Sequence, residues 1–288
     1  MDNEKILYHY CSLESFFNII KSSSFWLSDV SKSNDYEEFT WARDKTKAKI
    51  EEFLKTEEPQ ALKAWNAGHA LLPEIKDIGA NVYTLCLSEK SDLLSQWRGY
   101  ADDGMGISIG LSSEYFSNNE KHTSYTYAFG KIIYDENEQE HFIDEIVFDN
   151  ILKMMDGKGV GHVGLELNQN YILKYALCKN PYFWEEQEWR VMFLSNALPH
   201  PVSKKKNRVN QFLFSKTQYR IANKQLVSYV EMDFSEIKKD FIKEMWIGPK
   251  SNVLDSDIRD FLLSEGYYDS EYSIKEPIKI TKSVGSYR

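Results

Sequence analysis

The chain has 288 residues, a net charge of −9 and an aromatic fraction of 14%. A chain of this length forms one large domain or two and can bury a sizeable core. The negative charge argues against a protein that binds nucleic acid over a generally basic surface. The run from Lys204 to Arg208 is a local exception, for which we weigh a binding loop against a solvated turn.

Three cysteines, Cys11, Cys86 and Cys178, are scattered without metal-like spacing. An odd number without a CxxC pair argues against a disulfide framework and against a structural zinc site. All three lie in apolar sequence, so we expect buried, inert thiols. No secretory signal opens the chain, and no window approaches the ~18 apolar residues of a membrane span. We therefore expect a cytoplasmic protein without membrane contact.

Short strands and helices follow one another along the chain. We predict strands at 6–10, 25–28, 81–88, 104–111, 123–134, 211–214, 226–232, 241–248 and 278–280, and helices at 13–21, 91–100, 138–155, 166–177 and 254–265. Ser12 is the expected cap of the first helix. Residues 36–79 are rich in Lys, Glu and Ala and predict a helical insertion. With no linker or repeat, the pattern predicts a single α+β domain over residues 1–288.

The stretch from Phe183 to Leu194 combines Glu, Trp and Arg with an apolar, strand-like end. In an extended segment Glu186, Glu188 and Arg190 project from one face, because side chains alternate with period two. Two interpretations stay open: an ion-pair ladder ahead of a core strand, or a catalytic carboxylate at the start of that strand. Arg190 is correspondingly either the partner of Glu188 or a ligand-binding cation.

Other chemistries find little support in the sequence. The six histidines form no HxxxH or HExxH pair, so we expect no metal site. There is no GxSxG elbow and no P-loop, and no second acid is fixed for glycoside hydrolysis. Scattered acids give only weak support for a nuclease. His9 is distinctive because tyrosines flank it in a strand, although a structural role is more typical of such a histidine.

Several sequence blocks carry a resemblance to a known family. They are Leu7-Tyr8-His9-Tyr10-Cys11-Ser12, Asn34-Asp35-Tyr36-Glu37, Cys86-Leu87-Ser88 with Gln96-Trp97-Arg98-Gly99-Tyr100-Ala101, and Trp184-Glu185-Glu186-Gln187-Glu188-Trp189-Arg190. With Ile247-Gly248-Pro249, Ser283 and Tyr287-Arg288, these blocks resemble the bacterial domain-of-unknown-function family numbered 2971. The first block is also similar to that of ADP-ribosyltransferase-type folds, including DNA-modifying toxins.

The second resemblance implies a fold and a set of site residues. The fold is an ADP-ribosyltransferase-like split β-sandwich, from which the helical insertion departs. By this resemblance His9 holds the first-strand position, Glu188 is the catalytic carboxylate and Glu186 is its upstream neighbour. Ser88 matches the middle position, with Tyr100 as the alternative.

The same resemblance implies NAD as a substrate. Tyr8, Tyr10, Trp97 and Tyr100 are candidates for stacking the nicotinamide, and Arg98, Arg190 and Arg288 for binding a phosphate. The expected acceptor is nucleic acid or protein, and an antitoxin or defence partner is possible for a toxin or phage-defence effector. The alternative is a non-catalytic defence protein of the same fold that binds a nucleotide or a partner.

Overall fold

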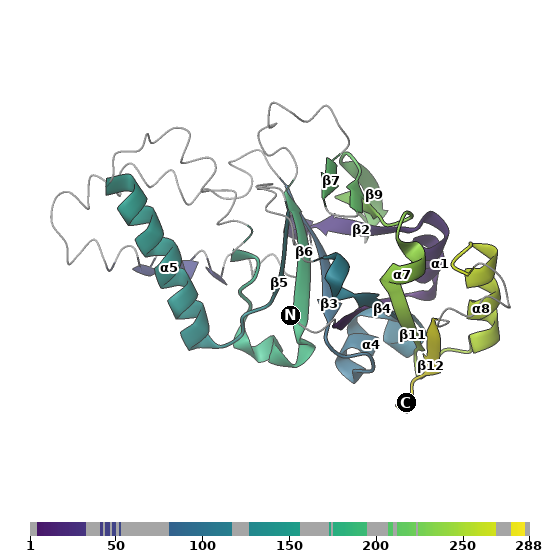
Figure 1. Cartoon of the computed structure of the whole chain (residues 1–288). Helices are drawn as coiled ribbons and strands as arrows, with labels where there is room; N and C mark the ends of the chain where they lie inside the picture. Colours follow the sequence, from purple (N-terminus) through teal and green to yellow (C-terminus); the bar gives the residue numbers. More distant parts are fainter. Residues whose placement is uncertain are drawn as a thin grey trace.

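The computed structural model describes residues 5–32, 81–116, 127–155, 175–194, 207–209, 212–222, 224–268 and 278–285, with isolated residues at 41–52 and 173. In this part of the chain strands dominate (Figure 1). The strands are β1 Ile6–Cys11, β2 Ser24–Asp29, β3 Val82–Ser88, β4 Ile107–Ser112, β5 Tyr127–Lys131, β6 Glu188–Leu194, β7 Asn207–Val209, β8 Phe212–Phe214, β9 Gln218–Ala222, β10 Gln225–Asp233, β11 Ile242–Ile247 and β12 Lys279–Lys282.

The helices lie mainly at the two ends of the molecule. They are α1 Leu13–Ser22, α4 Leu94–Tyr100, α5 Glu136–Met155, α7 Lys238–Phe241 and α8 Asp255–Ser264, with 3-10 turns η1 Val30–Lys32, η4 Asp102–Gly104, η5 Ser113–Tyr115 and η6 Pro181–Glu186. Figure 1 shows α1 and α8 at one end and α5 at the other. Ser12 caps α1 as predicted, since its hydroxyl accepts a hydrogen bond from the Ser15 amide at 3.1 Å.

The strands form one mixed sheet, which confirms the predicted α+β class. The order along the sheet is β12-β11-β4-β1-β3-β2-β10-β8-β7, while β6 pairs with β3, β5 with β6 and β9 with β10. The β11–β12 pair is parallel, whereas β1 and β4 run antiparallel over six residue pairs. Neighbours in this sheet are mostly distant in the sequence.

Strand β3 shares one of its edges between two other strands. It pairs with β6 along its whole length, from Val82 to Ser88. Two strands therefore pair with the opposite edge of β3. Strand β2 pairs with it at Tyr83 and Thr84, and β1 pairs with it at Ser88. Because β1 and β2 take different ends of this edge, they diverge at its middle, near Cys86.

The main core is rich in aromatic rings. Phe116 stacks on Phe129 and Phe212, with ring centroids 5.1 and 5.4 Å apart. Helix α1 buries Phe16, Ile19 and Ile20, which are spaced to share one face. Burial of such side chains is typically worth ~1.5–3 kcal/mol each. The core thus fixes β1, α1 and β2 around the point where β1 and β2 separate.

Most predicted elements are confirmed where the structure describes them. Strands β7 and β9 and the short helix α7 were missed, and η6 replaces an extended start of β6. Most of the predicted helix at 166–177 and most of the insertion at 36–79 lie outside the described residues, although those described between 41 and 52 are helical. Within the described part, no helix combines the length and the apolar character that crossing a bilayer requires.

Candidate functional site

The junction between η6 and β6 sets the position of two glutamates. The prediction that Glu186 and Glu188 share one extended face is wrong, because Glu186 ends η6 and Glu188 begins β6. Between them Gln187 has φ 44°, a left-handed conformation that is uncommon for a residue with a side chain. Gln187 thus separates η6 from β6, and the two carboxylates approach one cation instead of lying along a strand.

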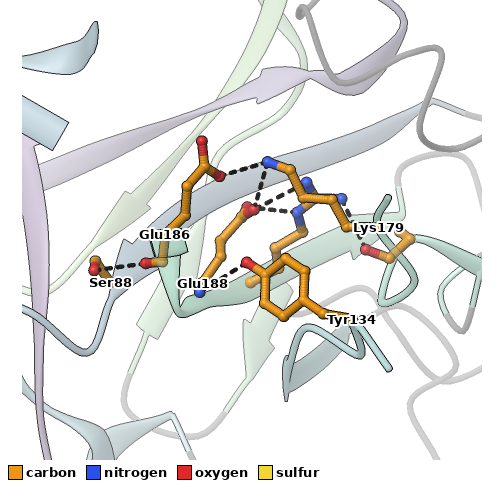
Figure 2. Close-up of polar contacts among 7 residues, drawn as sticks. Ser88, Tyr134, Lys179, Glu186 and Glu188 are labelled. Carbon is orange, nitrogen blue, oxygen red and sulfur yellow. Dashed lines mark hydrogen bonds and ion pairs between the residues drawn. The ribbon is translucent and has the colours of Figure 1, made fainter. Parts of the chain in front are cut away.

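That cation is Lys179, whose side chain is only 2% exposed. Its Nζ lies 2.6 Å from Glu186 Oε2 and 3.0 Å from Glu188 Oε2 (Figure 2). Arg190 completes the cluster from the next position on the same face of β6. Its Nε donates to Glu188 Oε1 at 2.6 Å, and its Nη1 donates to the Ala176 carbonyl at 2.9 Å. Two cations and two carboxylates therefore balance one another in a largely buried site.

The protonation state of Glu188 follows from these neighbours. Burial alone would raise the pKa of its carboxyl, but the charges of Arg190 and Lys179 lower the pKa to about 2. Glu188 is thus an anion at neutral pH and cannot serve as a general acid. Its backbone is also fixed, because the Glu188 amide donates to the Tyr134 hydroxyl at 3.1 Å (Figure 2). A permanent, preorganised negative charge is what this arrangement provides.

His9 lies where β1 and β2 separate along β3. Its Nδ1 is 3.2 Å from the carbonyl oxygen of Cys86. Because a carbonyl only accepts, Nδ1 carries the hydrogen and Nε2 is left as the acceptor of the neutral ring. Burial lowers the pKa of the imidazole, and the hydrogen bond to Cys86 opposes that shift. A neutral histidine at pH 7 follows.

A small pocket brings several predicted residues together. It has a volume of about 70 Å³ and is lined by His9, Tyr10, Cys86, Leu87, Gln96, Tyr100, Glu186 and Glu188. These residues come from β1, β3, α4 and the η6–β6 junction. The expectation of a buried, inert thiol holds for Cys11 and Cys178, but Cys86 is partly exposed and faces this pocket.

A larger pocket of about 300 Å³ adjoins the first one. The two share His9, Tyr10 and Tyr100. From there the larger pocket continues between α1 and β2, as far as Arg220 of β9. We call the two adjoining pockets together the His9 groove, with the glutamates at one end and Arg220 at the other.

Other predicted site residues lie outside the groove lining. The Ser88 hydroxyl donates to the Glu186 carbonyl at 2.8 Å, and Trp97 is buried with its Nε1 2.6 Å from Asp92 Oδ1. Arg98 is exposed, with its Nε 3.9 Å from Asp103. Arg190 is 1% exposed and donates to Glu188 and Ala176. Tyr8 donates to Glu244, and Arg288 lies outside the described residues.

Three residues of the site were not predicted from the sequence. Lys179 is a single cation that follows the apolar segment Tyr175–Cys178, with three glutamates at the next acidic positions. Gln96 lies one turn before Tyr100 on α4, and this spacing could have shown that they share a face. Arg220 carried no signal, because its strand was not predicted.

Comparison with known proteins adds a family but no closer relative. No curated protein and no solved structure matches the chain. A model of the family described as "Protein of unknown function (DUF2971)" matches residues 96–191. The matched segment begins at Gln96 and includes Tyr100, Lys179, Glu186 and Glu188 of the site. The match supports, over this segment, the resemblance of the sequence blocks to the DUF2971 family.

Proposed function

We propose that the chain is an ADP-ribosyltransferase-like enzyme that cleaves NAD in the His9 groove. One observation carries the proposal: His9, Tyr100, Glu186 and Glu188, from three distant parts of the sequence, line a single pocket. A second pocket of about 300 Å³, which is of the order of small-molecule sites, shares His9, Tyr10 and Tyr100 with it. The proposed fold is the split β-sandwich, and the separation of β1 from β2 supports it.

The chemistry suits a fixed negative charge. When the bond between ribose C1′ and the nicotinamide nitrogen breaks, its electron pair stays on nicotinamide and positive charge develops on the ribose. A nucleophilic atom of the acceptor then bonds to C1′ and loses its proton. A preorganised group facing such developing charge is typically worth ~3–4 kcal/mol. Glu188 supplies the charge deep in the site, and Glu186, with its side chain 17% exposed, is the more accessible carboxylate.

The other groove residues have supporting roles. His9 offers Nε2 as an acceptor for a ribose hydroxyl, because its Nδ1 hydrogen is directed at Cys86. Tyr100 is half exposed and lines both pockets, so it replaces Ser88 as the preferred middle residue and as the stacking surface for nicotinamide. The transferred group then goes to nucleic acid or protein, as in a toxin or a phage-defence effector.

A non-catalytic nucleotide-binding protein is the second candidate. The observation that favours it is the extent to which Glu188 is already engaged, since it accepts hydrogen bonds from both Arg190 and Lys179. A carboxylate in such a cluster can serve stability alone. Both candidates predict that the protein binds a nucleotide, but only the enzyme turns NAD over.

The deciding experiment measures nicotinamide release and transfer of label from NAD to mixed RNA, DNA and lysate protein. The variants are Glu186→Gln and Glu188→Gln, each checked for a folded state by circular dichroism. Glu185→Gln is the matched control, since it removes the same charge from an exposed position of η6 that does not line the pocket. We expect both groove variants to lose activity by about a hundredfold or more.

Two results would overturn the enzyme proposal. One is wild-type protein that binds NAD but releases no nicotinamide and labels no acceptor, which leaves the binding candidate. The other is turnover by Glu186→Gln and Glu188→Gln that equals turnover by Glu185→Gln, which removes these carboxylates from the reaction.

A further inference from the structure

The larger pocket of the His9 groove has an unusual charge for this chain. Among the described residues that line it there is no Asp or Glu, and Arg220 carries the one permanent charge. The whole chain, in contrast, has a net charge of −9. Glu231 lies opposite Trp26 in the strand register but does not line the pocket. The pocket therefore favours an anionic ligand within an otherwise acidic protein.

Hydroxyl groups cover much of the wall around this charge. Ser12, Ser15 and Ser22 come from α1 and its cap, and Ser24 and Ser28 come from β2. On β2 the serines alternate with core residues, so they share a face with Trp26 between them. Hydroxyls both donate and accept hydrogen bonds, which suits the oxygens of a phosphate and a sugar.

Arg220 is held in place but not satisfied. Its Nη2 donates to Ser28 Oγ at 2.9 Å, and its guanidinium lies 5.5 Å from the centre of the Trp26 ring. Its Nε is buried and has no hydrogen-bond partner among the described residues. An unsatisfied buried donor typically costs ~1–3 kcal/mol, and more when the group is charged. A ligand oxygen at this position would remove that cost.

We infer that Arg220 binds the phosphates of a nucleoside diphosphate seated in the larger pocket. The planar guanidinium, which lies over the Trp26 ring, presents a fork that matches phosphate geometry. The exposed rings of Trp26 and Tyr100 flank the pocket and offer stacking surfaces. The inference deepens the proposed function, on which it rests for the identity of the ligand: the diphosphate is that of NAD.

A nucleotide fits these observations better than a nucleic-acid strand does. The pocket has a volume of about 300 Å³, which is of the order of small-molecule sites. A strand of nucleic acid would need an extended basic surface along its backbone. Arg220 is one cation in a concave site, so it recognises one phosphorylated group.

The test is titration calorimetry of ADP, AMP and adenosine against wild type, Arg220→Gln and Arg220→Lys. Lys216→Gln is the matched control, because it removes one exposed positive charge from the segment before β9 and does not line the pocket. We expect Arg220→Gln to weaken ADP binding by about ten- to a hundredfold, the usual range for charged hydrogen bonds. Adenosine binding should be unchanged, and Arg220→Lys should restore only part of the loss.

The outcomes separate this inference from the enzyme proposal. ADP binding that Arg220→Gln and Lys216→Gln leave equally unchanged would overturn the role of Arg220, even if NAD is cleaved. ADP binding that depends on Arg220, in a protein that never releases nicotinamide, would support the role and overturn the enzyme. A short RNA that binds more tightly than ADP through Arg220 would overturn the nucleotide as its ligand.

Discussion

Lys179 controls the electrostatics at the deep end of the His9 groove. It is the shared partner of Glu186 and Glu188, and Glu188 also pairs with the buried guanidinium of Arg190. Charges are rarely buried unless paired, and removing one partner leaves another uncompensated. The contacts that keep Glu188 ionised are therefore also the contacts that offset the free-energy cost of burying its charge.

We predict that Lys179→Met lowers the free energy of unfolding by ~3–5 kcal/mol, because two carboxylates lose a buried counter-charge. Urea unfolding at pH 7 measures it. Lys5→Met is the control: Lys5 is exposed, its Nζ lies 3.5 Å from Glu89, and we expect a loss below ~1 kcal/mol. The double variant Lys179→Met with Glu188→Gln should be less unstable than the sum of the single losses. Additive losses, or a small effect of Lys179→Met alone, would contradict the shared cluster.

Only part of this cluster could be predicted from the sequence. Alternation along a strand placed Glu188 and Arg190 on one face, and their contact confirms it. The same rule could not include Lys179, which reaches both glutamates because η6 and the left-handed Gln187 take Glu186 out of the strand. Arg190 is likewise engaged by Ala176, a contact with no local sequence pattern.

At the scale of elements, glycines set how closely strand ends approach. A Cβ at Gly106 would lie 2.1 Å from the Cys11 carbonyl oxygen at the end of β1, and a Cβ at Gly248 would lie 2.3 Å from that of Gly104. The structure shows backbone in both places.

Gly106→Ala should therefore destabilise the protein by at least ~1–3 kcal/mol, the usual cost of forcing extra volume into a packed site. Gly99→Ala is the matched control, because nothing lies within 4 Å of its Cβ position and it sits in α4. Alanine in a helix is ~0.5–1 kcal/mol more favourable than glycine, so this variant should be unchanged or more stable. Thermal or urea unfolding of the pair tests the packing, and equal effects at both positions would contradict it.

Strand β9 shows why an element can escape prediction from the sequence. Its residues alternate, but Tyr219 and Ile221 are 63% and 82% exposed, while Arg220 faces the groove. An apolar pattern normally marks the buried face of a strand. Here the apolar residues face outward, so their pattern did not indicate a strand with a buried face. Because the strand was not predicted, Arg220 was not predicted as a residue of the groove either.

At the scale of the whole molecule, the site depends on pairings between distant segments. Strand β3 pairs with β6 about a hundred residues later, and β4 pairs with both β1 and β11. Local patterns predicted these strands individually but contain no information on which strands become neighbours. The resemblance of sequence blocks named His9 and Glu188 as residues of one site. The strand pairing of the sheet brings them to the same pocket.

Global stability should depend on pH through Glu188. Its pKa is lowered from 4.5 to about 2 in the folded protein, so below pH 4.5 the unfolded chain binds a proton that the folded chain does not. The contribution of ionised Glu188 to the free energy of unfolding is therefore fully present above pH 4.5. It is lost as the pH falls from 4.5 to about 2, which lowers the free energy of unfolding by up to ~3 kcal/mol. His9 acts in a separate window below pH 6.5, because its pKa is also lowered.

Urea unfolding between pH 7 and pH 3 should show this loss in wild type and in Glu185→Gln, whose side chain is exposed. Glu188→Gln cannot titrate, so its stability, although lower at pH 7, should change less between pH 4.5 and pH 3. The comparison of slopes is independent of the absolute stability of each variant. An acid dependence of Glu188→Gln as steep as that of Glu185→Gln would show that Glu188 is not the buried anion at the end of the groove.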